Sequence, residues 1–224
     1  MESPTRSRWR VATEAIGHFV SAAPLTFSWL ALLALTTLIQ HSLTGPQLHE
    51  LLLRGSTNLH HLATDPVRVL FSSLFWIDGR QWWPYLVVFC LFLAPAEHWL
   101  GALRWLGVGL VAHIVATYIG EGALYLDIQD ALASPRLINA RDIGVSYFVL
   151  GLAGVLTYRI ARPWRWLYLA AFLAAVTTAL ALNPSFTSIG HFSALLIGLA
   201  CYPLTLGRRG PRRDGPAYTA DLWY

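Results

Sequence analysis

The sequence DIGVSYFVLGLAGVLT, from Asp142 to Thr157, decides how the rest of the chain is interpreted. It is almost entirely apolar, begins with a carboxylate and carries Ser146 one turn inside the helix that it predicts. A second apolar stretch, IGHFSALLIGLACYP from Ile189 to Pro203, opens with His191, the last histidine of the chain. The two stretches predict two membrane helices, each with a chemically useful side chain near its start.

Ser146 and His191 are expected at a similar depth, and together they suggest nucleophilic catalysis. A serine hydroxyl is a weak nucleophile near neutral pH and needs a base within hydrogen-bond reach, a role that a neutral imidazole can take. Ala194 and Gly198 follow His191 on the same helix face, and small residues let a second membrane helix approach closely. Two plainer roles stay open. A membrane serine can bond its own helix backbone, and Asp142 can cap the helix start.

The composition is typical of an integral membrane protein. Apolar residues make up 55% of the 224 residues, charged residues make up 12%, and the mean hydropathy is +0.49. That leaves too little polar surface for a soluble domain of this size. The formal charge of +4 does not predict nucleic-acid binding, because the arginines are spread between and beyond the apolar runs.

The remaining cysteines and histidines predict neither a metal site nor another cofactor. Cys90 and Cys201 each lie inside an apolar run, where small buried hydrophobic residues are expected. His60 and His61 are adjacent, so on a helix they would point in different directions. A zinc site needs further ligands at fixed spacing, and none follows this pair.

Six apolar segments have about the length or composition of membrane spans. They are Ala22–Gln40, Trp82–Leu100, Arg104–Ile119, Ile143–Tyr158, Trp166–Leu182 and Ile189–Leu206. The connection over residues 42–81 carries only short apolar pieces, which suggests that it lies in the membrane surface. We therefore expect an all-α membrane protein: a six-helix bundle over residues 21–206 with a long interfacial first loop. Basic tails are expected at residues 1–20 and 207–224.

The arginines predict the orientation of this bundle. With six spans, 11 of the 16 arginines lie on the side of both termini, and cytoplasmic segments are enriched in basic residues. Both termini are therefore expected in the cytoplasm, in a multi-pass protein of the cell membrane. The helix starts that carry Ser146 and His191 are then expected near the outer leaflet.

These residues resemble the rhomboid intramembrane serine proteases over roughly residues 20–206. The likeness comprises Gly144-Val145-Ser146 at a helix start, and His191 followed by the small residues Ala194 and Gly198. DPVRVLFSSLFW, with Arg68, is similar to the family's first-loop segment, and APAEHWLG is similar to its end of helix 2. The resemblance implies a bundle in which Gly144, Ala194 and Gly198 pack beside a catalytic pair. It implies Ser146 as nucleophile and His191 as general base, cleaving single-span membrane proteins near the outer face of the lipid bilayer.

The chain departs from the family pattern around the oxyanion site. Tyr147 follows the serine where the family usually has glycine, and Val67 stands where its first loop has tryptophan. Aromatic residues after Gln81 replace the His and Asn that help to stabilise the oxyanion in the family. The candidate donors are therefore the backbone N–H of Ser146, the Tyr147 side chain and the Gln81 side chain.

Two other functions stay open. The altered start of helix 2 favours a rhomboid-like protein that binds membrane helices, as substrates or clients, without cutting them. A small transporter or channel would be expected to carry charged residues along its helix interiors or two similar halves. Beyond Glu97, His98 and His113 the chain shows few such residues and no repeat. Glu97 and His98 are expected to reach the membrane surface by snorkelling.

Overall fold

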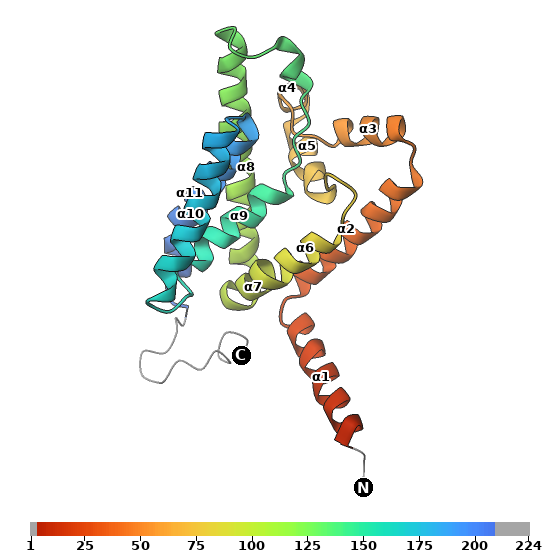
Figure 1. Ribbon diagram of the computed structural model, residues 1–224, viewed down its shortest axis with the longest axis vertical. Coiled ribbons are helices and arrows are strands. Elements are labelled where there is room, and N and C mark those ends of the chain that lie inside the picture. The colour runs from red at the N-terminus through yellow and green to blue at the C-terminus, as the bar shows by residue number, and fades with distance from the viewer. Residues whose placement is uncertain (1–3, 209–224) are drawn as a thin grey trace.

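A computed structural model describes residues 4–208 of the chain, with side chains described from residue 9 onward (Figure 1). In that part of the chain every regular element is helical. The α-helices are α1 (Pro4–Ser21), α2 (Pro24–Ser42), α3 (Gly45–Arg54), α4 (Leu59–Thr64), α5 (Pro66–Ser72), α6 (Trp83–Val88), α7 (Ala94–Leu100), α8 (Ala102–Gln129), α9 (Val145–Leu156), α10 (Trp164–Leu182) and α11 (Phe186–Ala200). A π-helical turn, η2 (Phe89–Leu93), joins α6 to α7, and short 3₁₀ turns are η1 (Ser73–Phe75), η3 (Pro135–Asn139) and η4 (Tyr202–Thr205).

Four of these helices are long and apolar enough to cross a membrane. They are Pro24–Ser42, Trp83–Leu100, Ala102–Gln129 and Trp164–Leu182, while the apolar helices α9 and α11 are shorter. The six helical regions lie where the six spans are expected. The span count itself stays a prediction, because α9 and α11 do not have full spanning length.

One predicted helix boundary is wrong. Helix α8 continues to Gln129 instead of ending near Ile119 in a polar loop over residues 120–141. Its added turns bury Glu121 and Leu124 against neighbouring elements, so acidic residues there do not end the helix. Within the predicted N-terminal tail, residues 4–21 form α1, which points away from the bundle in Figure 1. Residues 209–224 of the predicted C-tail lie outside the described part of the chain.

The apolar core lies where α2, η2, α8 and α9 meet. The Trp29 ring lies 5.0 Å from Phe89 and 4.8 Å from Phe148, which in turn lies 5.0 Å from Trp105. These rings are at most 8% exposed, and aromatic pairs at such distances add to the stability gained from burial. Cys90 and Cys201, expected to be buried, are instead partly exposed on the surface of the bundle.

Glu97 has a different role from the one expected. Its carboxylate does not snorkel but is 2% exposed, and it accepts hydrogen bonds from the backbone N–H groups of Leu25 (2.9 Å) and Thr26 (2.7 Å). Because the first N–H groups of a helix lack partners within it and carry partial positive charge, a carboxylate there stabilises the helix start. Glu97 therefore fixes the first turn of α2 against α7.

Helices α8, α9 and α11 pack unusually closely, side by side in Figure 1. A Cβ atom on Gly198 of α11 would overlap the backbone of Gly151 on α9, and one on Gly151 would overlap Ala112 on α8. Membrane helices associate through such small-residue contacts, because lipid offers them no hydrophobic drive to pack together. This close packing sets the positions of the side chains at the starts of α9 and α11.

Candidate active site

Ser146 and His191 meet at the starts of α9 and α11. Ser146 is the second residue of α9, and His191 lies in the second turn of α11, whose start is capped by Ser185. The His191 Nε2 and Ser146 Oγ atoms are 2.8 Å apart, a hydrogen-bond distance, and both residues are partly buried. This geometry lets Nε2 accept the proton of the serine hydroxyl.

The two side chains meet because α9 and α11 have almost no side-chain volume between them. Ala194 is fully buried one turn after His191, and Gly198 lies against the Gly151 backbone. Gly154 on α9 leaves room for the Leu195 carbonyl in the same way. Larger residues at these positions would separate the helices and lengthen the contact between Ser146 and His191.

Tyr147 lies directly beside the His191 ring. Its side chain is fully buried, and the two ring centroids are 5.3 Å apart in an edge-on arrangement with 69° between the planes. Its hydroxyl donates a hydrogen bond to Asp142 Oδ1 at 3.2 Å. Gly190, the residue before His191, leaves room for this hydroxyl, because a Cβ atom there would lie 2.5 Å from it. Tyr147 is thus fixed at both ends while its edge contacts the imidazole.

Asp142 does not cap α9, contrary to the plainer expectation for it. Helix α9 begins at Val145 with Gly144 at its N-cap, and no side chain caps it. Asp142 is instead 4% exposed, and its Oδ2 accepts a hydrogen bond from Thr57 Oγ1 at 3.3 Å. Burial raises the pKa of the Asp142 carboxyl to about 6, despite the hydrogen bonds from Tyr147 and Thr57 that lower it.

The segment between α3 and α4 holds the Asp142 backbone in place. The Asp142 carbonyl accepts hydrogen bonds from Thr57 N (3.0 Å) and Ser56 Oγ (3.0 Å), and the Asp142 N–H donates to Ser56 Oγ. Ser56 and Thr57 are fully buried. Sequence reasoning missed both residues, because a Ser-Thr pair in a loop carries no signal of a contact more than 80 residues away.

The three oxyanion candidates differ in their surroundings. As the second residue of α9, Ser146 has one of the backbone N–H groups that find no acceptor within the helix. The Tyr147 hydroxyl is already bonded to Asp142. Gln81 is exposed just before α6, and in residues 9–208 its side chain makes no hydrogen bond to Ser146 or His191. The Ser146 N–H is therefore the donor that lies at the nucleophile and is not already engaged.

A buried polar row on α8 also lies near this site. His113, Thr117 and Glu121 follow one another at a spacing of four residues and are at most 2% exposed. The His113 ring stacks on Tyr147 at 6.5 Å, and its edge fills the space over Gly144. Gly144 therefore packs against α8 rather than α11. The part of the chain that the structure describes holds no group of three or more side chains able to bind a metal ion.

Comparison with known proteins shows the family of the chain. A family model described as "Rhomboid-like protein" matches residues 18–211, which is most of the chain. No curated protein and no solved structure matches the chain.

Proposed function

Because the chain belongs to the family of rhomboid-like proteins, we propose that it is an intramembrane serine protease that cleaves single-span membrane proteins. The observation that carries this proposal is the 2.8 Å contact between His191 Nε2 and Ser146 Oγ. In the proposed topology the six helices α2, α6–α7, α8, α9, α10 and α11 all cross the cell membrane. Both termini are in the cytoplasm, and the catalytic pair lies towards the outer leaflet.

The lengths of α9 and α11 support a site below the membrane surface. Helix α9 has 12 residues and α11 has 15, so at 1.5 Å per residue they are about 18 Å and 22 Å long. A bilayer core is about 30 Å thick. If both helices end near the cytoplasmic surface, their starts lie several ångströms inside the outer surface, where a substrate helix would meet Ser146.

The proposed reaction is an acyl transfer in two stages. As Ser146 Oγ attacks the carbonyl carbon of the scissile bond, His191 Nε2 takes the hydroxyl proton. The Ser146 N–H donates to the oxyanion that forms, and the imidazolium then gives its proton to the departing amine. Water releases the second product by the same steps, with His191 again acting as base.

Tyr147 and Asp142 are proposed as positioning residues for His191. The base must present Nε2 to the serine, and His191 has no hydrogen-bond partner other than Ser146 Oγ in residues 9–208. Its orientation therefore depends on packing against the Tyr147 edge, which Asp142 holds in place. Fixed reacting groups contribute to catalysis because misplacement by about 1 Å can cost about 10²-fold in rate.

A non-cleaving rhomboid-like protein that binds membrane helices is the second candidate. The observation in its favour is that, of the three oxyanion candidates, the Ser146 N–H is the one that lies at the pair and is not already engaged. Removing an oxyanion donor typically costs about 10²- to 10³-fold in rate. With one oxyanion donor the reaction can be so slow that the protein binds membrane helices without cleaving them.

Labelling with a fluorophosphonate probe separates the two candidates. We expect the purified wild-type protein in detergent to be labelled, and the Ser146→Ala and His191→Ala variants to lose the label. Ser193→Ala is the matched control, since Ser193 is also a partly buried serine on α11, and it should label like the wild type. A folded wild-type sample that takes up no label would reject the protease and favour the non-cleaving binder.

A further inference from the structure

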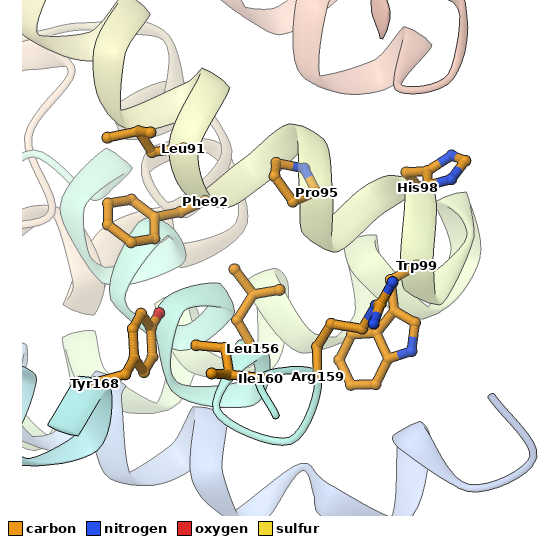
Figure 2. Close-up of a pocket in the computed structure, with 9 residues that line it drawn as sticks. All are labelled: Leu91, Phe92, Pro95, His98, Trp99, Leu156, Arg159, Ile160 and Tyr168. Carbon is orange, nitrogen blue, oxygen red and sulfur yellow. The ribbon is translucent and has the colours of Figure 1, made fainter. Parts of the chain in front are cut away.

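A pocket of about 290 Å³ lies at the opposite end of α9 from Ser146 (Figure 2). It is formed by the π turn and α7 on one side, and by the end of α9 and the start of α10 on the other. Apolar and aromatic side chains make most of its wall, chiefly Leu91, Phe92, Trp99, Leu156 and Tyr168. One charged side chain, that of Arg159, reaches into it beside the Trp99 ring in Figure 2.

The π turn shapes one wall of this pocket. A π turn inserts an extra residue into a helix and redirects its side chains, and such turns are frequent at functional sites. Here it covers Phe89–Leu93 and ends just before Pro95, which has no N–H to donate to the preceding turn. Phe92 projects from it to within 6.4 Å of the Tyr168 ring, and Leu91 beside it is 51% exposed. The apolar wall therefore continues out to the surface of the bundle.

Within the part of the chain that the structure describes, Arg159 is a cation without a partner. In residues 9–208 its side chain makes no hydrogen bond and no ion pair, although it is partly buried. Arg165 in the same turn differs, because its guanidinium donates to the Tyr158 carbonyl at 2.9 Å and to the Ile160 carbonyl at 3.1 Å. A partly buried guanidinium in an apolar pocket is costly unless an anion pairs with it.

The surroundings match a lipid rather than a protein side chain. Helix α10, which contributes to one wall, has only 6% of its span buried within the protein. In the proposed topology its remaining surface faces the bilayer. Arg104 and Arg208 lie at the same end of the bundle as Arg159, where the Arg104 guanidinium bonds the Leu204 and Leu206 carbonyls. Clusters of arginine at a membrane surface attract anionic lipid head groups.

We propose that this pocket binds an anionic phospholipid of the leaflet on that side. The phosphate pairs with the Arg159 guanidinium, whose planar fork matches phosphate oxygens. The acyl chains leave along Leu91 and the exposed side of α10. The proposal does not depend on proteolysis, since the pocket and the pair Ser146–His191 lie at opposite ends of α9.

The test is native mass spectrometry of the full chain in detergent, titrated with phosphatidylglycerol or with phosphatidylcholine of the same acyl chains. We expect the wild type to retain phosphatidylglycerol at least about fivefold more strongly. Arg159→Gln should remove that preference. Arg162→Gln is the matched control, because Arg162 lies in the same turn but is exposed and does not line this pocket; it should bind like the wild type.

A second variant tests the apolar half of the pocket. Leu91→Trp places a larger side chain at a position that is already half exposed, so the fold should tolerate it. It should lower phosphatidylglycerol binding while Arg159 is intact. Equal retention of the two lipids by the wild type would overturn the proposal. So would equal losses in Arg159→Gln and Arg162→Gln, which would mean that surface charge alone attracts the lipid.

Discussion

In residues 9–208 two serine–histidine pairs lie inside this bundle, and one of them, Ser146–His191, fits the proposed catalytic role. In the first, His191 Nε2 lies 2.8 Å from Ser146 Oγ. In the second, His113 Nε2 lies 3.5 Å from Ser73 Oγ. Both join elements far apart in the sequence. The difference between them lies in what else each histidine contacts.

In the second pair, both side chains already donate hydrogen bonds to one backbone carbonyl. His113 Nε2 lies 2.9 Å from the Leu70 carbonyl, and Ser73 Oγ donates to the same carbonyl at 3.2 Å. A carbonyl oxygen can only accept, so His113 Nε2 must carry the hydrogen and cannot take a proton from Ser73. The pair instead attaches the turn from α5 to η1 to the fully buried side of α8. His191 differs in that its Nε2 faces a hydroxyl, from which it can accept a proton.

Tyr147 separates the two histidines and contacts both. Its ring stacks on His113 at 6.5 Å and presents its edge to His191 at 5.3 Å. One aromatic ring thus links the pair Ser73–His113 to the proposed catalytic pair. Substitutions in the pair Ser146–His191 should mainly lower activity. Substitutions in the pair Ser73–His113 should mainly lower stability.

The largest expected effect on activity is that of His191→Ala. Removing the base should lower the rate of fluorophosphonate labelling by at least about 10³-fold, because an unactivated serine hydroxyl is a poor nucleophile. The melting temperature in detergent should change little, since the ring has one hydrogen-bond partner in the described part of the chain. If His191→Ala instead lost much stability but kept its labelling, His191 would have a structural role and not a catalytic one.

His113→Ala should show the opposite pattern. It removes a fully buried ring and leaves the Leu70 carbonyl with fewer donors, so it should destabilise the fold by about 2–4 kcal/mol. The free energy of unfolding measured in mild detergent checks this value. Labelling per folded molecule should fall much less than in His191→Ala, and an equally complete loss would contradict the structural role.

Asp142→Asn should change how stability depends on pH. Burial raises the Asp142 pKa from 3.8 to about 6 in the folded protein, so the folded state holds this proton more tightly than the unfolded chain. The associated stability is present below about pH 4 and is lost as the pH rises through 6. The loss is on the order of 3 kcal/mol.

The comparison with Asn isolates that contribution. Asparagine keeps an oxygen to accept the hydrogen bond from Tyr147 but does not ionise. The difference in unfolding free energy between wild type and Asp142→Asn should therefore shift in favour of the variant as the pH rises from 4 to 6. A constant difference across this range would mean that the carboxyl is not buried as described.

Tyr147→Phe should have a moderate effect on activity. It keeps the ring between the two histidines but removes the hydroxyl that bonds Asp142. We expect the labelling rate to fall about tenfold, because the ring edge against His191 is less firmly held. The double variant with Asp142→Ala should be no slower than Tyr147→Phe alone, since each change removes the same hydrogen bond. Additive losses would show that the two residues act separately.

Ser73→Ala should have the smallest effect. The hydroxyl shares its carbonyl acceptor with His113, so its loss should cost no more than about 1 kcal/mol of unfolding free energy. The labelling rate should equal that of the wild type. Because Ser146→Ala removes the same atoms from the other pair and should abolish labelling, the two variants form a matched test of which serine reacts.

The sequence by itself determined the class of the protein and the regions of its helices. Apolar composition and segment length are local properties, so six helical regions were expected close to where the structure has them. The patterns around Ser146 and His191 also sufficed to indicate the family, which the match over residues 18–211 shows. The end of α8 was missed, because acidic residues such as Glu121 suggest a polar loop. The structure shows that Glu121 is buried within the helix.

Only the tertiary structure decided which polar residues meet. Asp142 is read from the sequence as a helix cap, but Thr57, 85 residues earlier, holds it beside Tyr147 instead. The sequence suggests that Glu97 snorkels to the surface. Its carboxylate instead accepts hydrogen bonds from the first N–H groups of α2, more than 70 residues away. Both His113 and His191 lie inside apolar helices, but a carbonyl bonds Nε2 of His113, whereas Nε2 of His191 faces the Ser146 hydroxyl. Such distinctions depend on contacts between distant residues, which local pattern and composition do not encode.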